Sequence, residues 1–192
     1  MDRKTINKIR DEVHAACKSP KNHAGYSAWT HHIVPAVEFG IQLAKKMGAD
    51  KEIVELAVWL HDLGSVSCGE AEQDRHHITG RDLSQEILKQ YKYPADRIER
   101  VLHCIYAHRA TQDIPRETLE AEIVASADAM SHFYYLDDLF YLAFIVRRYE
   151  TDDARAFVLK KLSNSYKKLM PEAREMIDAK YEYIKKALRP GI

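Results

Sequence analysis

Cysteine is scarce in this sequence of 192 residues, and its spacing excludes several common uses. The three cysteines, Cys17, Cys68 and Cys104, lie far apart and form no CxxC pair. A scattered, odd-numbered set excludes a disulfide framework and a zinc-finger cluster, and it favours a reducing compartment. The opening stretch MDRKTINKIRDEV is charged and lacks the apolar core of a signal peptide, so we expect a cytoplasmic protein.

An excess of charge and a long apolar run are also missing. Lys and Arg together number 29, as do Asp and Glu, so the formal net charge is zero. This balance gives no indication of nucleic-acid binding. The longest apolar stretch, residues 133–146, is interrupted by Asp137 and Asp138 and is too short to span a bilayer. We therefore expect neither a membrane nor a nucleic acid as the partner.

Glycine and proline are few, at 7 and 6 residues, and alternating strand-like patterns are nearly absent. Apolar residues recur instead with the 3.6-residue period of helices. This spacing predicts helices over residues 3–17, 29–47, 51–62, 72–91, 95–109, 117–133, 134–148, 152–168 and 172–188, with loops at 18–28 and 64–75. No linker divides the chain, so we predict a single all-α domain over residues 1–192.

Histidine, by contrast, is abundant, with ten residues. Helix geometry sorts several of them by the face on which they lie. His32 lies at the edge of the apolar face of 29–47, four residues before Ala36, whereas His31 points nearly opposite. His108 continues the apolar row of 95–109, three residues after Ile105. We therefore place His32 and His108 on the inside.

The pair His76 and His77 begins the next histidine-bearing helix pattern. His76 lies one turn before Gly80 on the row that we predict to face inward, and His77 lies on a more polar edge. We therefore favour His76 as the inward residue. The choices of His76 over His77 and of His32 over His31 rest on helix facing and leave the alternatives open.

Two further positions place charge inside apolar segments. The run VELAVWL leads directly into His61 and Asp62, so a buried helix ends in an imidazole next to a carboxylate. Asp128 lies in the small, apolar segment EIVASADAM. A buried carboxylate is unfavourable unless it is paired with a cation or binds a metal.

Together these residues predict a metal site formed by side chains that are distant in the sequence. Imidazole and carboxylate ligands suit Fe, Mn, Co, Ni or Zn. Six ligands fit two ions bridged by Asp62, or one ion with His76 and His108 contacting substrate. The predicted ligands are His32, His61, Asp62, His76, His108 and Asp128.

The order of these residues resembles the signature of the HD-domain superfamily of metal-dependent phosphohydrolases. The matching segments are HHIVPAV, VELAVWLHDLG and ASADAM, with HHITG and CIYAHR supplying the two extra histidines of dinuclear members. The resemblance covers about residues 26–133, and residues 134–188 show only helical patterns. It implies an HD-domain-like helical bundle. Ser65 stands where the cyclic-dinucleotide phosphodiesterase subgroup has lysine, which argues against that subgroup.

The resemblance implies hydrolysis of a phosphate ester of a nucleotide or another small phosphorylated metabolite. A metal held with His61 and Asp62 as catalytic residues would activate a water. Arg75, Arg81 and Arg109 lie beside the inward histidines and are candidates for binding phosphate. The alternatives are a dinuclear iron oxygenase, which has similar ligands, and a non-catalytic binding or sensor module, against which the six filled positions argue.

The remaining segments have a structural interpretation and a functional one. The aromatic-rich stretch 133–146 predicts a core helix, with a dimer interface, and hence a homo-oligomer, as the alternative. The lysine pairs 160–161, 167–168 and 185–186 predict solvated helix faces, with a nucleic-acid groove as the less favoured alternative.

Overall fold

The computed structural model describes residues 1–22, 24–69, 74–109 and 114–189. Helices dominate these ranges and no strand occurs in them, so the all-α prediction is confirmed. Within the same ranges, no helix is both long enough and apolar enough to cross a membrane.

The helices follow the predicted order, but two of the predicted helices, 29–47 and 134–148, are each divided into two elements. The helices are α1 (Arg3–Cys17), η1 (Ala28–Ile33), α2 (Val34–Met47), α3 (Lys51–Leu60), α4 (Leu63–Cys68), α5 (His76–Gln90), α6 (Ala95–Ala107), α7 (Leu119–Tyr134), α8 (Leu136–Tyr141), η3 (Leu142–Val146), α9 (Thr151–Lys168) and α10 (Pro171–Ala187).

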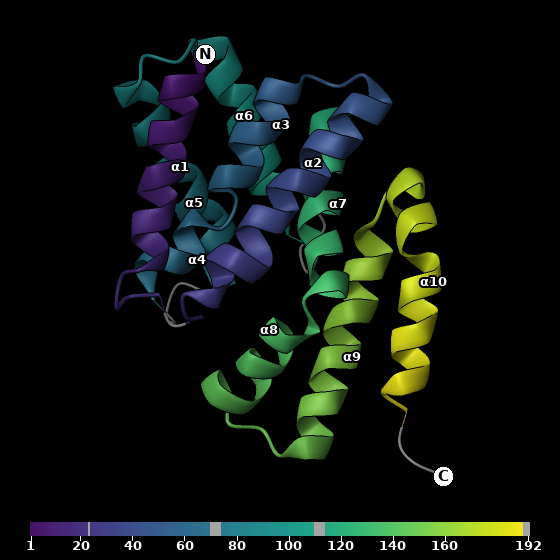
Figure 1. Cartoon of the computed structure of the whole chain (residues 1–192). Coiled ribbons are helices and arrows are strands. Elements are labelled where there is room, and N and C mark those ends of the chain that lie inside the picture. Colours follow the sequence, from purple (N-terminus) through teal and green to yellow (C-terminus); the bar gives the residue numbers. More distant parts are fainter. Residues whose placement is uncertain (23, 70–73, 110–113, 190–192) are drawn as a thin grey trace.

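Helix α7 lies at the centre of this arrangement (Figure 1). It packs against α2, α3 and α6 on one side and against α9 and α10 on the other. Every residue of α7 from Ile123 to Ser131 is buried. A helix that is apolar on all sides must be covered on all sides, which explains why the C-terminal helices pack here.

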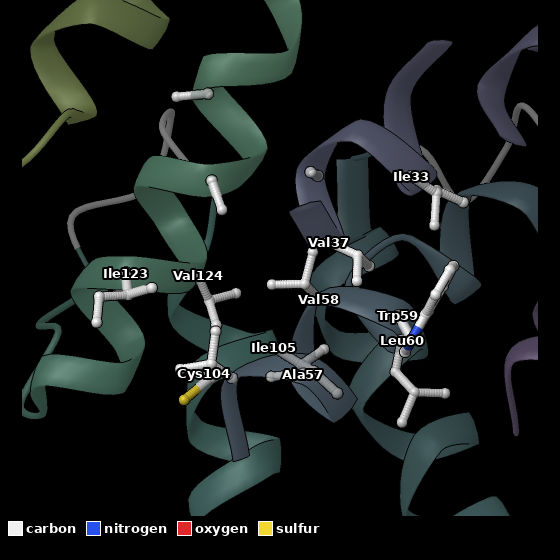
Figure 2. Packing of buried hydrophobic residues seen from close by; sticks show 14 of the residues in the cluster. Ile33, Val37, Ala57, Val58, Trp59, Leu60, Cys104, Ile105, Ile123 and Val124 are labelled. Atoms are coloured by element: carbon white, nitrogen blue, oxygen red, sulfur yellow. The ribbon is translucent and has the colours of Figure 1, made fainter. Parts of the chain in front are cut away.

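Side chains from α2, α3, α6 and α7 meet in one hydrophobic cluster (Figure 2). Val37, Val58, Ile105 and Val124 each expose 4% of their surface or less. The same cluster extends from Ile6, Ile9 and Val13 of α1 to Ile177 and Ile184 of α10, so the two ends of the described chain pack on a common core.

The helix that carries His61 and Asp62 has defined ends. Gly48 ends α2 in the left-handed conformation, with φ of 71°, which glycine adopts without strain. Asp50 then caps α3, because its side chain accepts a hydrogen bond from the Ile53 N–H at 3.3 Å. These two residues set the direction of α3 and therefore where its C-terminal end lies.

Three predicted segments differ in the structure. The predicted loop 64–75 contains helix α4, and the start of the predicted helix 72–91 falls partly outside the described residues, with α5 beginning at His76. The predicted helix 134–148 divides into α8 and the π-helical turn η3. Apolar periodicity alone cannot register such short elements, because they contain only one or two turns.

The aromatic segment 133–146 is not the core helix that its composition predicts. Phe133, Leu139 and Ala143 are buried, but Phe144 and Ile145 expose 41% and 61% of their surface. The alternative, an oligomer contact through this segment, stays a prediction.

A close approach of backbones brings α4 against α5 next to the predicted metal ligands. A Cβ atom on Gly64 would lie 2.6 Å from the backbone nitrogen of Gly80 and in steric conflict with the carbonyl of His76. Glycine at position 64 is therefore a requirement of this contact, and the contact places His76 opposite the end of α3.

We predict that Gly64→Ala lowers the free energy of unfolding by about 1–3 kcal/mol through overpacking. Gly40→Ala is the matched control, since Gly40 is also helical but its added Cβ would meet side-chain methyl groups of Val54 and Val58, at 3.2 and 3.1 Å, which can shift. Urea denaturation of both variants measures the difference. Equal stability of Gly64→Ala and the wild type would contradict the close contact.

Candidate metal centre

The structure brings the six predicted ligands together at one place in two groups. His32, His61 and Asp128 form one group, and Asp62, His76 and His108 form the other. Within each group, one ligand atom from each residue lies within 4.8 Å of the others. The residues come from η1, the end of α3, the start of α5, the end of α6 and the middle of α7.

Asp62 lies between the two groups and directs one carboxylate oxygen toward each. Its Oδ2 lies 3.1 Å from Nε2 of His32 and 3.6 Å from Nε2 of His61. Its Oδ1 lies 3.7 Å from Nε2 of His76 and 3.8 Å from Nε2 of His108. This is the position of a residue that could serve both groups.

Hydrogen bonds at the far side of the rings orient three histidines. In His61 and His108, Nδ1 donates to the backbone carbonyl three residues earlier, at 2.7 and 2.5 Å. In His32, Nδ1 lies 2.7 Å from Oγ of Ser131, whose hydroxyl donates to the carbonyl of Asp128. Each Nε2 thus faces the carboxylates, and in the neutral ring it is an acceptor.

Converging acceptors of this kind are unfavourable unless a cation lies among them. Nitrogen and carboxylate oxygen atoms approach within 4 Å, and the site is buried: His61 is fully buried and Asp128 exposes 6%. The donor set, imidazole nitrogen and carboxylate oxygen in two groups of three, fits one or two divalent transition metal ions.

The pKa shifts of the site residues reflect the same need for positive charge. Burial would raise the pKa of Asp62, but the charge of His61 and the hydrogen bond with His32 hold it well below its usual value. Burial lowers the pKa of His61 and holds that of His108 well below its usual value. For His32, burial is outweighed by Asp62 and Asp128, and its pKa is raised.

A buried lysine also contacts the metal centre, although its sequence context predicts a solvated face. The ammonium group of Lys168 donates to Oδ2 of Asp128, and both side chains are almost fully buried. Burial would raise the pKa of Asp128, yet the charge of Lys168 holds it well below its usual value. Burial in turn lowers the pKa of Lys168.

His132 is a second neighbour that sequence reasoning missed. Its ring stacks on that of His32 with 5.0 Å between centroids, and its Nδ1 lies 2.9 Å from Oγ of Ser165. The sequence did hold a signal for both residues. His132 follows Asp128 by four positions and Lys168 follows the apolar Val158, Leu162 row by way of Ser165, three positions earlier, so each shares a helix face with a residue that packs inward.

A pocket of about 350 Å³ opens onto both groups of ligands. The C-terminal elements supply its far wall, which includes Arg147, Lys161 and Phe157. Among the described residues, neither Arg147 nor Lys161 forms an ion pair, and Arg147 lies over the Phe157 ring, so the wall carries two positive charges.

The three predicted arginines occupy different places. Arg109 lines the pocket and donates to Asp74, close to His77. Arg81 donates to Asp82 and lies over the Tyr106 ring, and Arg75 is exposed; neither lines the pocket.

The histidines that we placed on the outside also differ from one another. His31 is partly exposed and lies 3.9 Å from Oδ2 of Asp137. His77 is buried, at 5% exposure, although its edge of the helix is polar. Burial and the charge of Arg109 lower the pKa of His77 to about 4. Leu83 shares with His76 and Gly80 the row of α5 that we predict to face inward, but it is 36% exposed. The buried face of α5 is therefore rotated toward His77.

Comparison with known proteins agrees with this fold. The HD domain family matches residues 30–132, which is more than half of the chain. Ribonuclease Y of Alkaliphilus metalliredigens is 32% identical over 100 residues, or 52% of this chain, and the chain spans only 19% of that relative.

Two solved structures resemble nearly the whole chain at low identity. Bacillus subtilis YpgQ in complex with ADP has a TM-score of 0.70 and 22% identity, covering 96% of this chain and 94% of its own. A predicted HD superfamily hydrolase from an uncultured Thermotogales bacterium has a TM-score of 0.56 and 16% identity, covering 94% and 92%.

The protein is thus an all-helical bundle with a buried cluster of histidine and aspartate residues. The chain belongs to the HD domain family.

We predict that Mn²⁺ stabilises the wild type against heat, because an ion that binds the folded state at a hundred times its Kd adds about 2.7 kcal/mol. His32→Ala should reduce this metal-dependent shift in melting temperature strongly, and His31→Ala should retain it. Thermal unfolding with Mn²⁺ and with EDTA measures the shift. A full shift in His32→Ala would contradict the assignment of His32.

We also predict that Lys168→Met destabilises the metal-free protein by about 3–5 kcal/mol, since the substitution leaves Asp128 buried without its cation. The neighbouring, exposed Lys167→Met is the control. Thermal unfolding in EDTA compares the two variants. An equal loss of stability in the two variants would show that the buried pair of Lys168 and Asp128 adds no stability beyond that of an exposed lysine.

Proposed function

We propose that this protein is a metal-dependent phosphohydrolase that cleaves a phosphate ester of a nucleotide or another small phosphorylated metabolite. The observation that carries the proposal is the presence, in one pocket, of two histidine–aspartate groups and the cations of Lys161 and Arg147. A phosphate group is a common substrate feature that interacts with a bound metal ion and with such cations at the same time.

A bound divalent metal would supply an activated water and positive charge for the phosphate oxygens. His32, His61 and Asp128 would hold one ion, and His76 and His108 a second, with Asp62 available to both. Asp62 and His61 occupy adjacent positions at the end of α3, which fixes their relative orientation without any mobile loop. We assign His61 and Asp62 as catalytic residues on this basis.

The residues of the far wall would bind and orient the substrate. Lys161 and Arg147 can donate to phosphate oxygens, and Arg109 can do so from the opposite side if it releases Asp74. The apolar side chains of Leu142 and Phe157 line the same pocket and offer a surface for a flat or apolar part of the substrate. Charge and apolar surface in one pocket suit a nucleotide.

The comparisons support a nucleotide as the ligand of the pocket. YpgQ, which shares the fold, was solved in complex with ADP. Ribonuclease Y, by its name, acts on RNA, but it aligns with this chain over a minor part of its own length. A pocket of about 350 Å³ suits a small ligand better than a polymer.

The test is phosphate release from a panel of nucleotides, sugar phosphates and a short RNA, after chelation and reloading with Mn²⁺, Fe²⁺, Co²⁺, Ni²⁺ or Zn²⁺. We expect metal-dependent release from a small phosphate ester and loss of that activity in Asp62→Ala. Metal-dependent uptake of O₂ without phosphate release would instead identify an oxygenase. Metal binding with neither reaction would favour a binding module.

We predict that Lys161→Met raises KM about tenfold or more for the substrate that the panel identifies, because a hydrogen bond to a charged group contributes about 1.5–3 kcal/mol. Lys160→Met, the exposed neighbour on α9, should leave KM unchanged. Steady-state kinetics of both variants provide the comparison. An equal KM in Lys161→Met and the wild type would remove Lys161 from the substrate site.

A further inference from the structure

A second hollow, of about 340 Å³, adjoins the pocket of the metal centre. Ser27, Tyr26, His31 and Tyr141 contribute to its lining. Asp138 of α8 lines both the hollow and the metal pocket, so the two spaces share a wall at this residue. A ligand that extends from the metal centre past Asp138 would reach the hollow.

Two residues that line the hollow carry buried polar atoms without hydrogen-bond partners among the described residues. They are Oγ of Ser27 and Oδ1 of Asp138. A buried polar group without a partner costs about 1–3 kcal/mol, and folded proteins contain few of them. Two such atoms on one hollow beside a reaction centre indicate that a ligand group completes their hydrogen bonding.

The chemistry of these atoms restricts that group. An ionised carboxylate such as that of Asp138 only accepts hydrogen bonds, and the hydroxyl of Ser27 both donates and accepts. Within the described ranges Asp138 forms no ion pair. A phosphate would be repelled at this position, so the ligand group must be a hydrogen-bond donor.

The pocket therefore carries charge of both signs. Lys161 and Arg147 attract a phosphate, whereas Asp138 attracts a hydrogen-bond donor. In a nucleotide, the hydroxyl groups of the ribose are donors separated from the phosphate by a few bonds. A pair of neighbouring hydroxyls can donate to the carboxylate and exchange a hydrogen bond with Ser27.

We propose that Asp138 and Ser27 bind the ribose hydroxyls of a nucleotide whose phosphate lies at the metal centre, and that they make the protein prefer ribonucleotides to deoxyribonucleotides. The inference rests on the proposed function for the placement of the phosphate. It concerns Ser27, which directly precedes η1, and Asp138 of α8, neither of which is a predicted metal ligand.

The experiment measures binding of ADP, 2′-deoxy-ADP and 3′-deoxy-ADP to the Mn²⁺-loaded protein by calorimetry. The wild type should bind ADP about tenfold more tightly than at least one of the deoxy analogues, as expected for the loss of one hydrogen bond to a charged group. Asp138→Asn should reduce this preference to about twofold, and Ser27→Ala should reduce it in part. Asp153→Asn, an exposed residue of α9, is the control and should keep the preference.

Binding and turnover are read separately so that the two proposals can fail independently. If ADP binds with the hydroxyl preference but no phosphate ester is hydrolysed, the inference stands and the proposed function fails. If phosphate esters are hydrolysed but Asp138→Asn keeps the preference, the inference fails alone. Absence of ADP binding, or equal binding of ADP and both deoxy analogues to the wild type, overturns the inference.

Discussion

The need for positive charge among buried acceptors is the constraint on which the centre of this fold depends. Two carboxylates, Asp62 and Asp128, lie within a helical core with histidine nitrogens directed at them. The low dielectric of such an interior makes uncompensated charge expensive. Lys168 supplies one cation from α9, and the remaining acceptors converge where a metal ion would complete the balance. The packing of the C-terminal helices on α7 is therefore part of the electrostatics of the site as well as of the core.

Helix ends do most of the positioning. His61 and Asp62 follow the last turn of α3, and His108 follows the last turn of α6, so each side chain projects from an end where the chain can change direction. The close contact of Gly64 with the backbone of α5 then fixes the second group of ligands against the first. Because ligands at helix ends are held by packing of whole helices, their geometry is set before any ion binds.

The sequence was informative about the fold and the metal ligands for a common reason: both follow from helix periodicity. Long amphipathic segments gave the helix order, and the histidines and aspartates that share their inward faces meet in the structure. His132 and Lys168 obey the same rule but were missed, because each lies beside residues that draw a simpler interpretation, an aromatic core in one case and a solvated lysine pair in the other. The division of 134–148 into α8 and η3, and the exposure of Phe144, depend on what α9 leaves uncovered, which periodicity within one segment does not contain.

The features that this protein shares with its family and those that are its own lie in different parts of the chain. The family match ends at residue 132 and includes all six predicted ligands, so the metal chemistry belongs to the part that this protein shares with its family. Asp138, Arg147 and Lys161, which line the rest of the pocket, come after that match. Substrate choice is a property of the pocket wall rather than of the fold. It follows that a relative which matches only about half of this chain, as ribonuclease Y does over 100 residues, carries little weight for the substrate.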